Sequence, residues 1–250
     1  MTTGPAELPR YLQLLWGIDD GVRRGPKPKL TVTDIGRAAV EVADADGLDA
    51  VSMKAIAQRL GVTTMSLYRY VEAKEDVFEI MLDVAYGRPG PRVAAGGDWR
   101  ERIASWAGAV AEVQRARPWM ARVPMTRPPA GPCTLLWTEA GVSAFADTPL
   151  TGQEKLSSLL VVDGFVRNHV RMAADLGELG ASGPGRQQQA GRSSQYEVVL
   201  GQVIDETDYP CLTRAVHDQA PGDDDFYADE LAFGLGVILD GIAARVAAAG

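Results

Sequence analysis

The sequence predicts an all-α protein, in which an N-terminal three-helix helix-turn-helix domain is joined by a connecting helix to a larger helical domain. Three observations support this fold class. Two short helix signatures flank a single glycine in residues 51–71, VSMKAIAQRLGVTTMSLYRYV. Apolar residues recur at helical spacing on both sides of this stretch. No alternating run is long enough to predict a strand.

The stretch 51–71 predicts two helices joined by a tight turn. The first helix begins at Ser52, whose hydroxyl can accept a hydrogen bond from an unpaired amide of the first turn. It ends at Gly61, because glycine adopts a positive φ most easily. The second helix follows the candidate cap Thr63, spans about residues 64–70 and is anchored in the core by Leu67.

The outward side of the second helix combines hydroxyls, aromatic rings and a guanidinium, and it contains no acid. Such a surface suits the phosphates and base edges of DNA. A helical hairpin in any soluble protein has apolar residues at similar spacing. The spacing alone therefore does not decide between a DNA-binding helix-turn-helix and an ordinary hairpin. The outward set consists of Thr64, Met65, Ser66, Tyr68, Arg69 and Tyr70.

Charge is unevenly distributed along the chain. The net charge is −8 at pH 7, which by itself argues against binding to nucleic acid. Residues 23–74, however, contain nine Lys and Arg and six Asp and Glu. Residues 75–250 contain fifteen Lys and Arg and twenty-four Asp and Glu. A basic N-terminal module on an acidic body can direct one face to DNA while the remainder keeps the protein soluble.

Residues 1–29 are predicted to form a flexible basic arm. Residues 1–22 are weakly patterned, and a glycine and two prolines disfavour a helix in the basic run that contains Arg23, Arg24 and Lys27. The arm either follows the DNA backbone or minor groove, or it is a solvated linker. The residues leave both alternatives open.

Two further helices complete the predicted DNA-binding domain, residues 30–88. One begins with a capping box of Thr31 and Asp34 and stops at Gly47. The other opens at Lys74, with two acids in its first turn, and is the connecting helix. Gly and Pro then interrupt the pattern in residues 88–97.

Residues 95–250 are predicted to form the larger domain, with helical periodicity throughout. Residues 180–194 are rich in Gly, Ser and Gln and are expected to form a mobile loop. Pro118 ends the first helix of this domain, and a Pro-rich stretch follows it to Pro132. The expected helices cover about 99–117, 134–145, 155–179, 196–204, 211–217 and 224–248.

Composition excludes several other classes of protein. The apolar runs are too short for a membrane span and the N-terminus lacks a signal-peptide core, so we expect a cytoplasmic protein. Cys133 and Cys211 form no CxxC motif and only two His are present, so we expect no metal or other cofactor. A nucleophilic set of Cys133, His169 and Asp163 has no recognisable local signature, so catalysis is not expected.

The N-terminal part resembles the TetR family of transcriptional repressors. The resemblance covers about residues 30–87 and depends on the Ala and Leu-Gly-Val before the turn, on Ser-Leu-Tyr after it, and on a Lys just past the Tyr-Val. The closing segment FYADELAFGLGVILDGIAARV more loosely resembles the tetracycline-repressor type of ligand-binding domain. The resemblance implies a homodimer in which the last helices form a four-helix bundle, and in which each subunit places its recognition helix in a major groove.

The resemblance also implies roles for individual residues. Lys54 would reach a guanine edge, and the start of the recognition helix would face the bases. Tyr68 and Tyr70 have packing alternatives, the first partly in the core and the second against the first helix of the domain. The implied base contacts are Thr64, Met65, Ser66 and Tyr68, and the implied backbone contacts and caps are Ser52, Thr63, Arg69, Tyr70 and Lys74.

The second half of the family implies a pocket for a small, partly apolar effector. Aromatic and Met side chains suit such a ligand, although most apolar residues on these helices belong to the core. The tetracycline repressors hold a magnesium–drug complex through a His near the middle of this domain, whereas residues 118–132 here contain no His. Tetracycline is therefore not the expected effector. The candidate lining residues are Trp106, Met120, Trp137, Phe165, His169 and Met172.

The resemblance implies a repressor that binds a palindromic double-stranded operator as a homodimer and is released by its effector. We expect the effector to act by repositioning the connecting helix, which changes the spacing of the two recognition helices. A ligand-independent DNA-binding protein and a transcriptional activator are the alternatives that the sequence leaves open.

Overall fold

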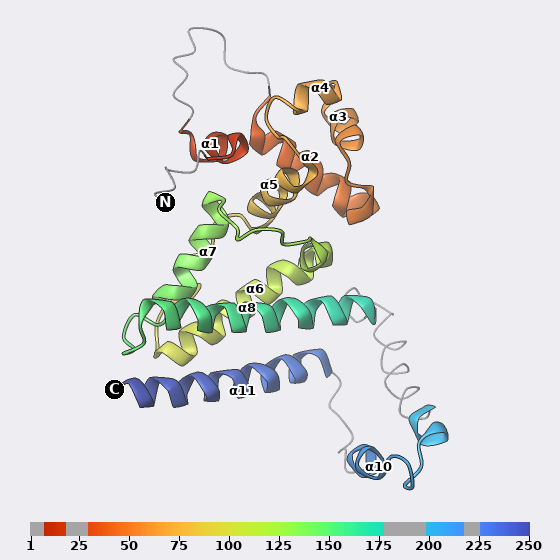
Figure 1. Cartoon of the computed structure of the whole chain (residues 1–250), viewed down its shortest axis with the longest axis vertical. Helices are drawn as coiled ribbons and strands as arrows, with labels where there is room; N and C mark the ends of the chain where they lie inside the picture. The colour runs from red at the N-terminus through yellow and green to blue at the C-terminus, as the bar shows by residue number, and fades with distance from the viewer. Residues whose placement is uncertain (1–7, 19–29, 178–198, 218–225) are drawn as a thin grey trace, which may run out of the picture.

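The computed structural model describes residues 8–18, 30–177, 199–217 and 226–250. Every regular element in these residues is helical, which confirms the predicted fold class. Figure 1 shows α2 to α5 gathered at one end of the molecule, with α6, α7, α8 and α11 at the other. The helices are α1 Arg10–Trp16, α2 Val32–Asp46, α3 Met53–Leu60, α4 Thr64–Leu67, α5 Lys74–Tyr86, α6 Trp99–Ala116, α7 Pro132–Ser143, α8 Gly152–Asp175, α10 Pro210–His217 and α11 Phe226–Ala249, with 3₁₀ turns at Leu48–Ala50 (η1) and Pro118–Arg122 (η2).

Helix α2 begins as its capping box predicts. Thr31 accepts from the amide of Asp34, and the Asp34 carboxylate accepts from the amide of Thr31 at 2.9 Å. The buried face of α2 crosses α5 at Gly36, where an added Cβ would lie 2.7 Å from Ile80 Cγ2 and 2.8 Å from Val84 Cγ2. The absence of a side chain at Gly36 therefore allows the two helices to pack closely.

The helix-turn-helix is present, but its second helix is shorter than predicted. Helix α3 is capped by Ser52 and ends at Gly61 with φ of 65°, whereas α4 covers only Thr64–Leu67. The chain turns at residues 68–70 because Leu67 is fully buried and the Tyr70 hydroxyl donates to the carbonyl of Leu30 at 2.9 Å. These tertiary contacts end the helix before Tyr70.

Helix α1 corrects the prediction that residues 1–22 form a mobile arm. Residues 10–16 are helical, and Tyr11 and Leu12 are buried in the same core as α2 and α5. Seven residues between Pro9 and Gly17 are too few to display a helical period, which is why the sequence pattern did not reveal this helix. Arg23, Arg24 and Lys27, the other part of the predicted arm, lie outside the described residues.

The larger domain surrounds a second core. Helix α6 begins at Asp98, which accepts from the amide of Glu101, and α8 begins at Thr151 in the same way. Residues 199–203 are helical, in line with the helix predicted over 196–204, whereas the expected loop at 180–194 lies outside the described residues. The core contains Ile103, Trp106, Val110, Phe145, Val162 and Val166.

The two domains share buried residues. Trp119 and Met120 of η2 pack into the N-terminal core, although they follow α6 in the chain. The Trp119 indole donates to Asp44 at 2.7 Å, and Arg117 forms an ion pair with the same carboxylate at 3.0 Å. The segment η2 therefore joins the larger domain to the C-terminal end of α2.

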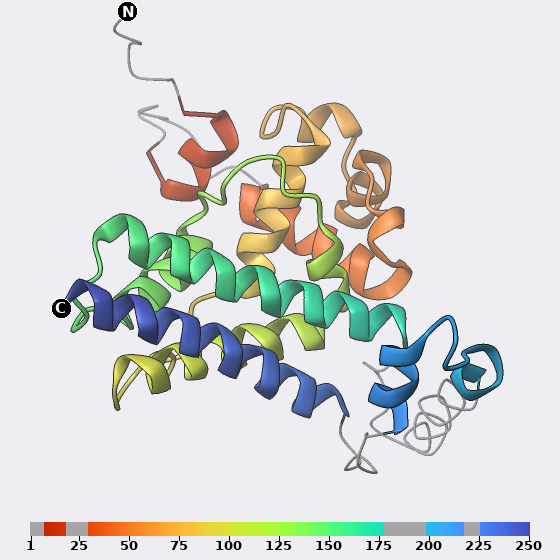
Figure 2. The ribbon, with the colours of Figure 1, turned by 60° about the horizontal axis from the view of Figure 1, so that its bottom comes forward.

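Helix α11 is apolar on an exposed side. Its segment Ala228–Ala249 has the length and mean hydropathy of a membrane span, so the prediction that every apolar run is too short was wrong for this helix. Only 11% of its most apolar window is buried, with Phe233 and Val237 among the exposed residues. Helix α11 runs beside α8 (Figure 1, Figure 2). Leu160 and Val161 of α8 are also exposed.

Candidate functional site

The turn and start of α4 are held by local hydrogen bonds. The Thr63 hydroxyl oxygen accepts from the amide of Ser66 at 3.3 Å, and the two hydroxyls lie 2.9 Å apart. Leu67 is fully buried beneath them. This arrangement leaves Met65 and Tyr68 exposed on the outer side of α4, whereas Thr64 and Ser66 are half-buried.

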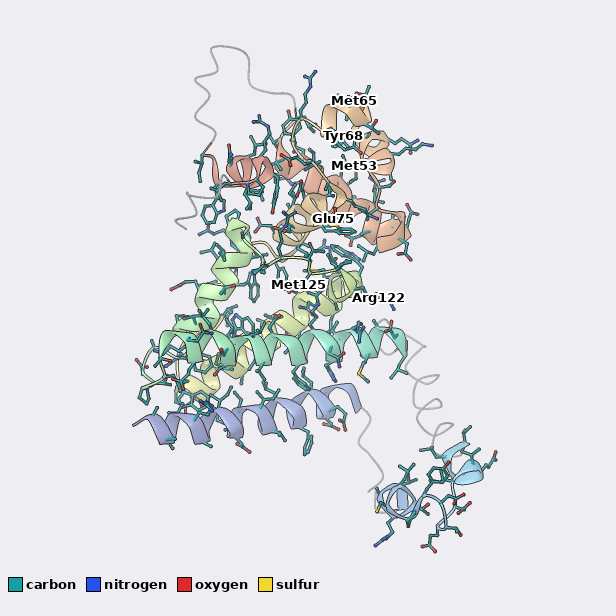
Figure 3. All side chains as sticks on the ribbon, viewed as in Figure 1. Met53, Met65, Tyr68, Glu75, Arg122 and Met125 are labelled. Carbon is teal, nitrogen blue, oxygen red and sulfur yellow. The ribbon has the colours of Figure 1, made fainter. Side chains whose placement is uncertain are left out.

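Apolar and aromatic side chains dominate this outer side. Met65 is 72% exposed and Tyr68 is 51% exposed, so the outward placement of both residues agrees with the structure. Figure 3 shows Met53, the first residue of α3, at the same end of the molecule as these two residues; the sequence did not point to it. Met53 is half-buried, and its position beside Ser52 at the start of α3 gives the surface a second thioether.

The cationic residues of this end are only partly paired. Arg59 forms an ion pair with Glu41 at 2.8 Å, which reduces its availability to phosphates. Within the described residues, Lys54 and Arg69 form no ion pair and are exposed. Both side chains are therefore available to phosphates.

The remaining predicted backbone contacts also have structural roles. The Ser52 hydroxyl accepts from the amide of Ala55 at 3.1 Å. The ammonium group of Lys74 lies over the ring of Phe78, 5.0 Å from its centre. Tyr70 is half-buried, and its hydroxyl is bonded to Leu30, so the structure favours the packing alternative for this residue.

A cavity of about 410 Å³ lies beneath the helix-turn-helix domain. It is bounded by α5, α6, α7, α8 and the segment 123–131 that follows η2. In Figure 3, Glu75 lies on α5 and Met125 on this segment; both line the cavity. The aromatic lining residues are Phe78, Tyr86, Trp106 and Trp137.

The structure separates the six predicted lining residues. Trp106 and Trp137 line the cavity, whereas Met120 is buried in the N-terminal core. Phe165 and His169 stack on each other with ring centres 5.9 Å apart, and Phe165 packs against Gly234 of α11. Met172 is 52% exposed. Trp106 and Trp137 thus line the cavity, and the other four candidates do not.

The candidates on α8 lie outside the cavity for a geometric reason. Its cavity face is the stripe that contains Leu156, Leu159, Asp163 and Arg167, at helical spacing. The predicted residues of α8 lie on a different stripe, which faces α11 or solvent. The polar pair Asp163 and Arg167 within an apolar stripe is the sequence signal that could have identified the cavity face.

The indole groups of the cavity have no free hydrogen-bond donor. Trp106 donates to the carbonyl of Trp137 at 2.8 Å, and Trp137 donates to the carbonyl of Gly87 at 3.0 Å. Arg167 donates to the carbonyls of Ala121 and Val123. The indoles thus provide apolar walls, and Arg167 secures the segment after η2.

Two polar groups retain hydrogen-bonding capacity inside the cavity. Within the described residues, the Asp163 carboxylate forms no hydrogen bond, and burial raises its pKa while nearby Arg167 opposes the rise. The Tyr86 oxygen accepts from Gln114 at 2.7 Å, which leaves its own proton available to a ligand. Burial, and then the charge of Asp163, raises the pKa of Tyr86 to about 12, so this hydroxyl remains protonated.

No group of three His, Cys, Asp or Glu side chains is arranged to hold a metal ion in the described part of the chain.

Comparisons with known proteins match both domains. Residues 35–81 match the model for bacterial regulatory proteins of the tetR family, and residues 91–246 match the tetracyclin repressor-like C-terminal domain. The HTH-type transcriptional repressor DrrR1 of Streptomyces coeruleorubidus is 33% identical, over 98% of this chain and 89% of its own. An HTH-type transcriptional regulator of Saccharopolyspora erythraea is 34% identical, over 74% of this chain and 75% of its own.

Solved structures share the fold. ActR of Streptomyces coelicolor in its apo form has a TM-score of 0.68 at 22% identity, and covers 90% of this chain and 100% of its own. Its complex with actinorhodin has a TM-score of 0.67 at 23% identity, with coverage of 87% and 97%. The sequence matches, which include a full-length relative, establish more than the fold: this chain belongs to the TetR family of transcriptional regulators, which are DNA-binding proteins and not enzymes.

Proposed function

We propose that this protein is a cytoplasmic repressor that binds a palindromic operator as a homodimer and leaves it when a small, partly apolar molecule enters the cavity. The observation that carries the proposal is the double role of α5. One side of α5 packs against α2 in the DNA-binding domain, and Glu75, Phe78, Leu82 and Tyr86 line the cavity. A ligand in the cavity therefore touches the helix that supports the recognition helix.

The DNA-binding part of the proposal is supported by the surface of α4. The recognition helix offers Met65 and Tyr68 for apolar contacts with bases, such as a thymine methyl group. Lys54 and Arg69 supply unpaired positive charge at the same end of the molecule. The sequence similarity to a named transcriptional repressor supports repression over activation.

The homodimer is supported by the exposed apolar side of α8 and α11. Phe233 is 71% exposed, Leu160 68%, Val237 57% and Val161 56%. Large apolar side chains that gather on one face of a soluble protein mark an interaction surface. A two-fold contact between α8 and α11 of two copies would cover this face and pair the recognition helices.

The chemistry of the cavity indicates an aromatic effector with a hydrogen-bond donor. Indole and phenyl walls suit a flat ring system, and about 410 Å³ accommodates a small organic molecule. Asp163 would accept from an amine or hydroxyl of the ligand, and Tyr86 would donate to a carbonyl. ActR, which has the same fold, is solved in complex with actinorhodin.

The effector must prefer the DNA-free conformation. A shift of the conformational equilibrium from 99:1 to 1:99 requires about 10⁴-fold tighter binding to the favoured state, or about 5.5 kcal/mol. DNA and effector then weaken each other's binding by the same factor. Burial of an aromatic ring system and a hydrogen bond to Asp163 can supply a difference of this size.

The proposal is tested by selecting DNA duplexes from a random pool with the full chain. The expected product is an inverted repeat that binds one dimer, with half-sites about one helical turn apart or a multiple of this distance. Binding to single half-sites, or retention of all sequences alike, would support an architectural DNA-binding protein instead. Reporter expression from a promoter that contains the repeat separates repression from activation.

A further inference from the structure

Helix α1 contacts both the recognition domain and the boundary of the cavity. Residues 10–16 precede both segments that match the TetR family models, which begin at residues 35 and 91. Tyr11 is 1% exposed and Leu12 is 6% exposed, so the helix is packed firmly against the body. A seven-residue helix spans about 10 Å, enough to join two neighbouring parts of a domain.

The N-terminal end of α1 contacts the turn after the recognition helix. The Arg10 side chain donates through Nε to the carbonyl of Arg69 at 2.8 Å. Arg69 lies directly after Tyr68, the residue that ends α4. A movement of Arg10 would therefore act on the backbone that fixes the direction of α4.

The middle of α1 contacts residues that line the cavity. The Tyr11 hydroxyl donates to Glu79 at 2.5 Å, and the Arg127 guanidinium lies over the Tyr11 ring, 5.3 Å from its centre. Arg127 also pairs with Glu79 and, at 2.5 Å, with Asp76. Since Glu79 and Arg127 both line the cavity, Tyr11 is one contact away from a bound ligand.

The C-terminal end of α1 holds the segment 123–131. The Trp16 indole donates to the carbonyl of Ala130 at 2.9 Å, and Ala130 lines the cavity. Gly17 then ends the helix with φ of 65°. Both ends of α1 are thus tied, through Arg10 to the recognition domain and through Trp16 to the cavity wall.

We propose that α1 is a coupling strut, in which Arg10, Tyr11 and Trp16 are positioning residues that transmit changes in the cavity wall to the end of the recognition helix. The proposal rests on the proposed function, because it assigns this role to the same cavity and the same DNA-binding surface. A ligand that displaces Arg127 or Ala130 moves α1 as a body, and Arg10 then shifts the carbonyl of Arg69. The strut acts beside α5, which offers a second route between the two sites.

Reciprocity allows this coupling to be tested with DNA alone. If a change at Ala130 reaches Arg69, then DNA bound at Arg69 must change the environment of Trp16. The probe is the inverted-repeat duplex selected by the wild-type chain, and the reporter is 5-fluorotryptophan observed by ¹⁹F NMR. The chain has five Trp, so single Trp→Phe variants assign every signal.

The expected result is a DNA-induced shift of the Trp16 signal in the wild-type protein. In Arg10→Ala at saturating duplex, this shift is lost, because the contact with Arg69 is removed. Gln13→Ala is the matched control: it lies on the same helix, and its side chain donates to Leu8, outside both sites. This control retains the wild-type shift.

A second variant tests the other end of the strut. Trp16→Phe keeps an aromatic ring but removes the donor to Ala130, and it leaves α5 unchanged. The DNA-induced shift of Trp137, in the cavity wall, is expected to fall by more than half in this variant while the duplex still binds. Equal thermal unfolding of both variants and the wild type excludes a general loss of structure.

Two outcomes overturn the strut. One is a Trp16 signal that does not respond to DNA in the wild type. The other is a response of equal size in Arg10→Ala. Failure to select any duplex would instead overturn the proposed function, and the strut with it, so the two failures are distinguishable.

Discussion

Asp163 is a largely buried carboxyl group that has no structural role in the described residues. No described residue donates a hydrogen bond to it, whereas Asp83 accepts from the amides of Cys133 and Thr134 at 2.7 and 2.9 Å. Burial raises the pKa of both groups. Asp83 therefore has a structural role, because its carboxylate caps α7. Asp163 has no such role, and it lines the cavity.

Asp163→Asn is expected to stabilise the folded protein at neutral pH. Because the folded-state pKa of Asp163 is raised, its charged form costs stability, and the free energy of unfolding falls as pH rises from 3.8, its ordinary value, through the raised value. The amide lacks this dependence. Urea unfolding at a series of pH values should show an advantage of the variant that disappears towards acid pH.

Asp83→Ala is the contrasting variant. It removes the acceptor of two backbone amides at the start of α7, so a loss of about 1–3 kcal/mol is expected at neutral pH. If Asp163→Asn destabilised the protein as strongly, Asp163 would have a structural partner and would not be available to a ligand.

Arg69 and Met65 are expected to make different contributions to DNA binding. Arg69→Ala should weaken binding to many sequences alike and lower the salt dependence by about one charge, because a guanidinium without an ion pair contacts phosphate. Met65→Ala should mainly reduce discrimination at one or two base pairs, by about 1 kcal/mol each. Fluorescence anisotropy with matched and mutated duplexes at several salt concentrations measures both effects, and an exchange of the two patterns would refute these roles.

At the scale of helices, local sequence signals predicted where a helix begins better than where it ends. The hydroxyls of Thr31, Ser52 and Thr63 lie next to the amides that they cap, so their effect is visible in the sequence. The end of α4 depends on a hydrogen bond between Tyr70 and Leu30, forty residues apart, which no local pattern contains. Helix α1 was missed for the same reason, because its stability comes from distant residues such as Glu79.

The candidate site was predictable to a different extent in each domain. The DNA-binding face follows from the phase of one short helix about the buried Leu67. The cavity depends on how four helices are rotated relative to each other, and α8 carries apolar residues on more than one side. The family resemblance and residue type therefore pointed to Trp106 and Trp137 but not to Tyr86, Asp163 or Arg167.

The crossing of α2 and α5 gives a prediction for the helix-turn-helix domain. Gly36→Ala places a Cβ against Ile80 and Val84 and should destabilise the protein by about 1–3 kcal/mol. Gly108→Ala is the control: it lies within α6 with no heavy atom within 4 Å of an added Cβ, and should stabilise by about 0.5–1 kcal/mol. Thermal or urea unfolding measures both, and equal effects would contradict the close packing at Gly36.

For the whole molecule, the exposed side of α11 predicts the oligomeric state. Phe233→Glu introduces a charge into the proposed contact between two copies, and is expected to yield monomers by analytical ultracentrifugation and to lose binding to the inverted repeat. Met65→Glu is the matched control, since Met65 is 72% exposed and Phe233 71%. The control should remain a dimer, and a dimeric Phe233→Glu would place the interface elsewhere.

The fold explains how a cavity of one domain can act on a surface of the other. Trp119 and Met120 lie in the N-terminal core, α5 belongs to both parts, and α1 ties Arg69 to the cavity wall through Ala130. These contacts link the two domains. In the proposed mechanism, a ligand that rearranges the cavity changes the support of both recognition helices in the dimer.

The most direct test of this coupling is a linked titration of the full chain with the selected duplex and an aromatic compound that quenches the fluorescence of Trp106 and Trp137. The compound is expected to weaken duplex binding, and saturating duplex is expected to weaken compound binding by the same factor. Asp163→Asn should bind the compound more weakly and bind the duplex as the wild type does. Compound and duplex that bind together, each with unchanged affinity, would contradict the account.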